Sequence, residues 1–448
     1  MTRLWFDTAL LPDGWASSVR LTIADGLIAK VETETPAAPG DERGFAAVPG
    51  VGNLHSHAFQ RAMAGLAEAP APRGGDDFWS WREVMYRFVE RLTPDDVEAI
   101  AAQAYAEMLE CGFTRVGEFH YLHHDIGGAA YADPAEMVHR IVAAAGQTGI
   151  GLTLLPVLYA HSGFGGQIAA PHQQRFTHSL DGFGALFERS RLSLQGLADG
   201  VLGVAPHSLR AVTPEELAAL TPLAGAAPIH IHIAEQVREV SDCLAWSGQR
   251  PVAWLLDHAP VDERWCLVHA THMDTAETAG LARSGATAGL CPITEANLGD
   301  GLFPGEGYLA HGGRFGIGSD SNVLIDLSEE LRLLEYGQRL TTRARGCLGS
   351  GVQLFRGSQH GGARALGVSS AGLQAGAAAD IVSLNPDHPA LAARRGDALL
   401  DGWIFAARGG AVDTVWRRGE RVVDGGRHVR ADTIGRRYRR MLAKVLAE

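Results

Sequence analysis

Polar side chains that can bind a metal ion or carry protons recur where apolar segments of the chain end. A His-Ser-His triplet occupies positions 55–57, His232 and Glu235 follow a second apolar segment, and His269 and Asp320 follow two others. Chance alone would give about one H-x-H pair for 19 histidines in 448 residues, so the triplet is informative only through its position. Imidazole and carboxylate groups are the usual ligands of zinc and similar divalent ions. The pattern therefore predicts a metal-dependent enzyme.

Three histidines and one aspartate are the expected ligands of a single ion. His55 and His57 share one face of a strand, because side chains alternate with period two. His230 and His232 share a face in the same way, and His232 is nearer the strand end. We therefore assign His232 to the metal and His230 to a hydrogen-bonded position one layer deeper. Asp320 adds a carboxylate from the last strand, and this set, with room for a water, favours Zn²⁺.

Two further polar residues remain available for proton transfer. Glu235 and His269 end two different segments, and neither is needed as a metal ligand. The alternative for Glu235 is an acid at a helix N-terminus, since VREVSDCLAW follows it. A metal ion lowers the pKa of its bound water to roughly 7, so a neighbouring carboxylate could pass protons to a leaving nitrogen. We favour that role for Glu235.

This chemistry requires a fold that gathers the ends of distant strands. Apolar, β-rich runs alternate with helical stretches through the middle of the chain: AAVPGVGNL, TRVGEF, GLTLLPVLY, VLGVAP, APIHIHIA, WCLVHA, ATAGLCP and RFGIGSD. Helix starts are indicated at Thr93-Pro94, Asp133-Pro134 and Thr213-Pro214. Eight such runs predict a parallel sheet closed into a (β/α)₈ barrel, whose catalytic groups collect at the carboxyl ends of the strands. The alternative is an open doubly wound sheet, but no run is followed by a glycine-rich phosphate-binding motif.

The residue patterns near both ends of the chain predict short strands and turns. RLWFDTALL and SVRLTIADGLIAKVE lie near the N-terminus, and the latter indicates a hairpin at Asp25-Gly26. ADIVSLNP and VDTVWRRGERVVDGG lie near the other end. We predict a small β-sandwich domain built from residues 1–48 and 370–430, a barrel over residues 49–369, and a C-terminal helix over residues 431–448.

Composition limits the classes of partner. Hydrophobic residues make up 46% of the chain and charged residues 20%, which is enough for a large core. The net charge of −12 argues against nucleic acid or an anionic membrane as a partner. The apolar runs are too short to span a bilayer, and Asp7 interrupts any signal-peptide pattern. Five widely spaced cysteines fit a reduced compartment. We expect a cytoplasmic enzyme that acts on a small-molecule substrate and assembles as a homodimer.

The ordered set of motifs resembles the amidohydrolase superfamily. These motifs are H-S-H at 55–57, H-I-A-E at 232–235, His269 and S-D at 319–320. Many members bridge two metals with a carboxylated lysine, but the only lysines here, Lys30 and Lys444, lie outside the predicted barrel. The resemblance therefore implies the mononuclear deaminase branch, with one ion held by His55, His57, His232 and Asp320.

Within that branch, several segments are similar to those of the N-formimino-L-glutamate deiminases of histidine degradation. The segments are VPGVGNLHSHAFQRAMAG, DDFWSWREVMYR, GEFHYLHH, VAPHSLRAV and HIHIAEQ. The resemblance implies hydrolysis of the formimino C=N bond to give N-formyl-L-glutamate and ammonia. It implies proton transfer by Glu235, His269 and Asp320. It implies substrate contacts from Gln60, Arg82, Tyr121, His207 and Arg210.

The charge of such a substrate agrees with the arginines. A dicarboxylate must meet local cations in an acidic protein, and arginine binds carboxylate through a bidentate fork. Rival interpretations are a deaminase of guanine, cytosine or a related heterocycle, whose neutral ring favours amide and aromatic contacts, and an imidazolonepropionase. A non-catalytic scaffold would be expected to lose ligands, and a metal-storage protein would not need Glu235 or His269. The sequence indicates no role for His120, His123 or His124.

Overall fold

A parallel barrel forms the larger part of the computed structural model, which describes residues 1–68 and 78–447. Its strands are β5 (Val51–Ser56), β6 (Phe113–His120), β7 (Gly151–Leu158), β8 (Val201–Leu202), β9 (Ala205–Pro206), β10 (Ile229–Ile233), β11 (Trp265–His269), β12 (Thr287–Leu290) and β13 (Arg314–Ile317). Each neighbouring pair is parallel, and β8 and β9 both pair with β7. These strands follow the eight predicted runs in order.

Backbone hydrogen bonds at two seams close the strands into a barrel. At one seam the Asp320 amide donates to the carbonyl of His55 at 3.0 Å, and the His57 amide donates to the carbonyl of Asp320 at 3.0 Å. At the other seam the His230 amide donates to the carbonyl of Val204 at 3.1 Å. The predicted closed barrel is therefore confirmed over the open sheet, and closure itself sets Asp320 beside the His-Ser-His triplet.

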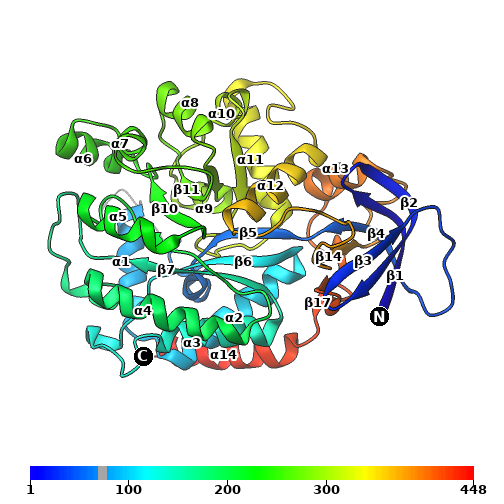
Figure 1. The fold of residues 1–448 in the computed structure, drawn as a ribbon, viewed down its shortest axis with the longest axis horizontal. Coiled ribbons are helices and arrows are strands. Elements are labelled where there is room, and N and C mark those ends of the chain that lie inside the picture. The colour runs from blue at the N-terminus through cyan, green and yellow to red at the C-terminus, as the bar shows by residue number, and fades with distance from the viewer. Residues whose placement is uncertain (69–77, 448) are drawn as a thin grey trace.

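Helices surround the barrel, as Figure 1 shows. They are α1 (Phe78–Val89), α2 (Pro94–Glu110), α3 (Glu136–Thr148), α4 (Leu180–Ser193), α5 (Pro214–Leu220), α6 (Val237–Ser247), α7 (Pro251–His258), α8 (Thr275–Ser284), α9 (Pro292–Leu298), α10 (Gly305–Ala310), α11 (Leu327–Thr342) and α12 (Gly351–Ala365), with 3₁₀ turns η1 (Ala58–Met63), η2 (Ile126–Gly128), η3 (Pro171–Gln173), η4 (Leu194–Gly196) and η5 (Thr221–Ala224). α2 and α5 begin after Thr93 and Thr213, as predicted, and both threonines form capping boxes. α3 begins at Glu136, slightly after the predicted start.

Both chain ends contribute to one small sheet at the side of the barrel (Figure 1). Its strands are β1 (Thr2–Leu11), β2 (Gly14–Ala24), β3 (Leu27–Glu32), β4 (Glu42–Pro49), β14 (Ile381–Leu384), β15 (Val412–Arg417), β16 (Glu420–Asp424) and β17 (Arg427–His428). They are hydrogen-bonded in the order β17-β16-β15-β14-β4-β1-β2-β3, so the predicted β domain is one continuous sheet. The β2–β3 hairpin turns at Asp25 and Gly26, whose φ values of 51° and 79° suit a two-residue turn.

One predicted strand is wrong as a single element. Residues 46–49 of the run AAVPGVGNL belong to β4 of the small sheet, and the barrel strand β5 begins at Val51. Gly50 separates them at a close approach, because a Cβ there would lie 2.2 Å from the Thr114 side chain. An apolar run without polar interruption gives no local sign that the chain passes from one sheet to another.

Two helices follow the barrel in sequence. α13 (Asp397–Ala406) packs against α11 and α12, and α14 (Ala431–Ala447) packs along α2 (Figure 1). The division into residues 1–48 with 370–430, 49–369 and 431–448 stays a prediction. Within the described part of the chain, no helix is long and apolar enough to cross a membrane.

Candidate active site

A cavity opens at the carboxyl ends of the barrel strands, the position at which barrels of this kind bind their ligands. The predicted site residues that line it are His57, Gln60, Arg82, Tyr121, His207, Arg210, His232, Glu235, His269 and Asp320. His55 lies beneath it and is fully buried. The barrel thus brings the predicted residues together, although Asp76 and Asp77 of the motif DDFWSWREVMYR lie outside the described residues.

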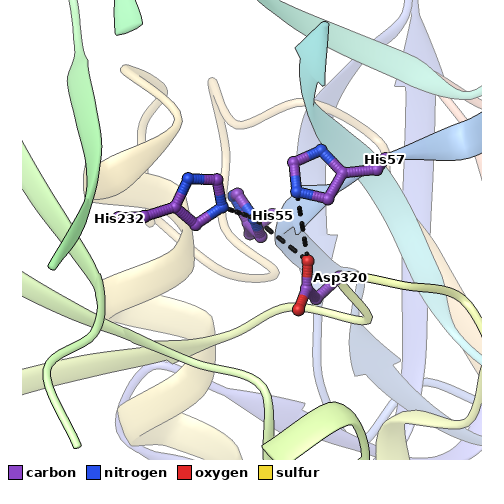
Figure 2. A group of neighbouring side chains, drawn as sticks. All are labelled: His55, His57, His232 and Asp320. Carbon is purple, nitrogen blue, oxygen red and sulfur yellow. Dashed lines mark hydrogen bonds and ion pairs between the residues drawn. The ribbon is translucent and has the colours of Figure 1, made fainter. Parts of the chain in front are cut away.

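Four of these side chains converge on one point. Figure 2 shows the three imidazole rings and the carboxylate pointing toward one another, and their ligand atoms lie within 4.8 Å of one another. The Asp320 Oδ1 atom lies 3.3 Å from His55 Nε2 and 3.2 Å from His57 Nε2. His55 Nε2 and His232 Nε2 are 3.0 Å apart. This arrangement matches the predicted metal-ligand set.

The hydrogen bonds behind the rings indicate that a cation belongs between them. His57 donates from Nδ1 to the carbonyl of Phe119, and His232 donates from Nδ1 to the carbonyl of His207, each at 3.0 Å. Both Nε2 atoms therefore present lone pairs to the same point, beside a carboxylate. Burial lowers the pKa of His55 to about 3 and the pKa of His232 well below its ordinary value, so both stay neutral, as ligands must. The donor set fits a divalent metal ion.

A second cluster offers a poorer donor set. His269, Cys291 and Asp320 also place their ligand atoms within 4.8 Å of one another. This cluster offers three ligand atoms and a single imidazole, whereas the first offers four ligand atoms and three imidazoles. We therefore favour the site with three histidines.

A buried amide network and unusual backbone angles orient the strand ends. Asn53 Nδ2 donates to Ser319 Oγ at 2.6 Å, and Ser319 Oγ donates to Asn322 Oδ1 at 2.6 Å. These bonds tie the loop after β13 to β5 on both sides of Asp320. His269 and Asp320 have φ values of 69° and 45°, in the left-handed region that costs energy for residues other than glycine. This left-handed backbone conformation directs the side chains of His269 and Asp320 into the cavity.

Glu235 and His269 face each other at the cavity floor. Glu235 Oε1 lies 3.9 Å from His269 Nε2, which lies 3.8 Å from Asp320 Oδ2. His269 Nδ1 donates to Glu295 Oε1 at 3.3 Å, so Nε2 is the nitrogen presented to the cavity. Burial raises the pKa of Glu235. Burial opposes the charged form of His269, but Glu235, Glu295 and Asp320 together outweigh it and raise the pKa of His269 to about 10.

A different glutamate occupies the helix-capping position that was the alternative for Glu235. Glu239 accepts hydrogen bonds from the backbone amides of Ala234 and Glu235 at 3.1 and 3.2 Å. The side chain of Glu235 lines the cavity instead. Glu239 and Glu295 were not anticipated from the sequence, because a capping acid within a helix carries no signal of its proximity to a cavity.

Two arginines and several neutral donors line the remaining wall. Arg82 lies on α1, and Arg210, only 9% exposed, follows the β9 strand with its Nε atom 4.0 Å from Glu239 Oε2. Gln60 Nε2 donates to the Tyr121 hydroxyl at 2.8 Å. The wall therefore presents positive charge and amide donors to whatever enters, which suits an anion.

Four histidines near the barrel strands that were assigned neither a metal nor a catalytic role make structural contacts: His120, His123, His124 and His230. His123 and His124 donate from Nε2 to the carbonyls of Val157 and Thr177 at 3.0 and 2.8 Å. His230 donates from Nε2 to the carbonyl of Ala365 at 2.7 Å, which agrees with the predicted deeper position. His120 packs against His123 at 5.4 Å between ring centroids.

Comparison with known proteins identifies the family of this barrel and its site. The family model "Amidohydrolase family" matches residues 46–422. The chain belongs to the amidohydrolase family. A second model, "Formimidoylglutamate deiminase HutF, N-terminal domain", matches residues 1–45. Formimidoylglutamate deiminase of Pseudomonas aeruginosa is 51% identical over 456 residues, which covers 100% of both chains.

Solved structures agree with this family assignment. An amidohydrolase from Brucella melitensis is 55% identical, covers 100% of both chains and superposes with a TM-score of 0.97. An adenosine deaminase from Xanthomonas campestris with bound zinc is 21% identical, covers 100% of this chain and 99% of its own, and has a TM-score of 0.83. The second likeness supports the amidohydrolase fold alone.

Proposed function

We propose that this amidohydrolase hydrolyses N-formimino-L-glutamate to N-formyl-L-glutamate and ammonia, a step of histidine degradation. The observation that carries the proposal is the 51% identity over the full length of a formimidoylglutamate deiminase. The cavity supports it independently, because Arg82 and Arg210 supply the cations that a dicarboxylate needs. A neutral heterocycle such as guanine or cytosine would not require two arginines in the same cavity.

In this proposal His55, His57, His232 and Asp320 hold one zinc ion. The ion would supply Lewis-acid activation of a water nucleophile, whose pKa such ions lower to roughly 7. The zinc reported in the Xanthomonas campestris structure is consistent with this choice, as are the nitrogen and oxygen donors. Metal analysis of the purified protein tests both the identity of the ion and the expected ratio of one per chain.

The protein side chains would then carry the protons. His269, kept protonated by the carboxylates around it, orients the attacking water, and the Asp320 carboxylate accepts its proton as it adds to the formimino carbon. Glu235 delivers two protons in turn to the terminal nitrogen, the first taken from the attacking water and the second from the hydroxyl group of the tetrahedral adduct. The C–N bond then breaks, and ammonia leaves as the carbonyl of the formyl group forms. The 3.9 Å separation of Glu235 Oε1 and His269 Nε2 leaves both groups within reach of the same small reacting centre.

The substrate contacts we propose are the residues along the cavity wall. Arg82 and Arg210 would pair with the carboxylates. Gln60, Tyr121 and His207 would complete the polar contacts around the glutamate backbone. Their shared placement in one cavity supports these roles.

Ammonia release tests the function directly. The purified protein is offered N-formimino-L-glutamate, guanine, cytosine and imidazolonepropionate at equal concentrations. We expect rapid ammonia release from the first compound only. Faster turnover of a heterocycle would replace the proposal with a heterocycle deaminase that uses the same metal site. The expected homodimer and cytoplasmic location stay predictions, tested by light scattering and by cell fractionation.

A further inference from the structure

A closed ring of hydrogen bonds joins four side chains in and beside the cavity wall. Arg82 donates from Nε to the Tyr86 hydroxyl at 2.6 Å and from Nη2 to the Tyr159 hydroxyl at 3.1 Å. Gln173 donates from Nε2 to the same two hydroxyls, at 3.2 Å for Tyr86 and 2.7 Å for Tyr159. Both tyrosines line the cavity and are less than a tenth exposed.

The direction of each hydrogen bond in the ring is fixed. Arginine has donors only. The Gln173 amide cannot be reversed, because its Oε1 atom accepts the backbone N–H of Ala170 at 2.8 Å, which leaves Nε2 facing the tyrosines. Each tyrosine oxygen therefore accepts two hydrogen bonds, which uses both of its lone pairs.

The remaining hydrogen-bonding capacity of each tyrosine is its hydroxyl proton. Burial and the neighbouring Tyr86 hydroxyl raise the pKa of Tyr159 above its ordinary value, so this phenol stays protonated. Neither proton can bind well to the other hydroxyl, whose oxygen already accepts twice. The two hydroxyls interact with each other, but within residues 1–68 and 78–447 no other acceptor for either proton is found. Two buried donors thus face a cavity that also holds Arg82.

We propose that Tyr86 and Tyr159 donate their hydroxyl protons to the substrate carboxylate that Arg82 pairs with. This inference rests on the proposed function and adds two substrate-binding residues to it. Arg82 donates two of its N–H groups to the tyrosine oxygens. These hydrogen bonds polarise the two O–H groups, which makes them stronger neutral donors. A carboxylate, with about four acceptor sites, is the ligand that can satisfy a guanidinium and two phenols together.

Glutarate, a dicarboxylate without the reacting group, is the probe that tests the inference. Its dissociation constant is measured by calorimetry for the parent, Tyr86→Phe and Tyr159→Phe, each with full metal content. We expect each substitution to weaken binding by about 10-fold or more, the usual cost of a hydrogen bond to a charged group. Tyr308→Phe is the matched control, because that buried hydroxyl donates to the Arg314 carbonyl at 2.9 Å outside the cavity.

Measuring glutarate binding again in an Arg82→Met background distinguishes two roles for the tyrosines. They either donate hydrogen bonds to the carboxylate themselves or only hold the Arg82 side chain in position. If the tyrosines bind the carboxylate themselves, Tyr159→Phe still weakens glutarate binding when Arg82 is absent. Loss of its effect in that background would overturn the inference and leave the tyrosines as supports of Arg82. Unchanged binding in the single variants, or no glutarate binding by the parent, would overturn it too. If Tyr159→Phe does not fold, Tyr86→Phe decides alone.

The two proposals fail separately. Turnover of N-formimino-L-glutamate by the parent tests the proposed function. A parent that turns the substrate over while both single variants keep its glutarate affinity would refute only the role of the tyrosines. A parent that binds glutarate through the tyrosines but releases no ammonia would refute only the proposed substrate.

Discussion

Replacing Glu235 by glutamine is the sharpest perturbation of the proposed chemistry. The carboxamide has nearly the same size but cannot deliver a proton at neutral pH. Glu235 is only 4% exposed, so bulk water cannot readily replace it as the proton donor. Loss of a positioned acid/base group typically costs about 10²- to 10⁴-fold in rate. Because this site is buried, we expect the upper half of that range, which corresponds to about 4–5.5 kcal/mol of barrier.

The assay follows ammonia release from N-formimino-L-glutamate under saturating substrate. Glu235→Gln should lower kcat about 10³- to 10⁴-fold while KM and metal content stay near parent values, because the arginines and ligands are untouched. Glu277→Gln is the control, since that buried carboxylate accepts the amides of Ala253 and Asp274 outside the cavity. It should lower the melting temperature and leave kcat unchanged. A Glu235→Gln enzyme with full metal content and a kcat within tenfold of the parent would refute the proton-transfer role.

Three further predictions address the metal, the substrate and acid stability. Chelation should abolish ammonia release and leave the far-ultraviolet circular dichroism unchanged, because the barrel core is large; two tight ions per chain would contradict the single site. Arg82→Met and Arg210→Met should each lower kcat/KM about 10- to 150-fold at unchanged metal content, whereas formamidines without carboxylates should react slowly and equally in all three enzymes. Burial beside His120, His124 and His178 lowers the pKa of His123 well below 6.5, so below that pH only the unfolded state gains its proton and stability falls. His123→Gln should therefore flatten the fall in unfolding free energy between pH 6 and 4.5 by about 1 kcal/mol per pH unit, and an identical slope in both proteins would disprove this assignment.

Short-range patterns were sufficient for much of the fold. The Thr93 and Thr213 starts depend on side chains that bond amides three residues away, and the Asp25-Gly26 turn depends on two adjacent backbone angles. The alternation of strands and helices is equally local. The sequence does not show that residues 46–49 belong to β4 and not to the barrel strand β5, because an apolar strand has the same pattern in either sheet.

The residue types and their order along the chain determined the expected chemistry by themselves, since imidazoles and carboxylates that recur at the ends of several strands can together bind a metal and move protons. Only the tertiary structure decided how these groups meet. The closure of β13 on β5 sets Asp320 against His55 and His57, and left-handed backbone at His269 turns its ring into the cavity. The ring that joins Tyr159 to Gln173 has no sequence signature. Arg82 and Tyr86 lie one turn apart on α1, but Tyr159 follows β7 and Gln173 lies in η3, so the packing of the whole barrel sets their distances.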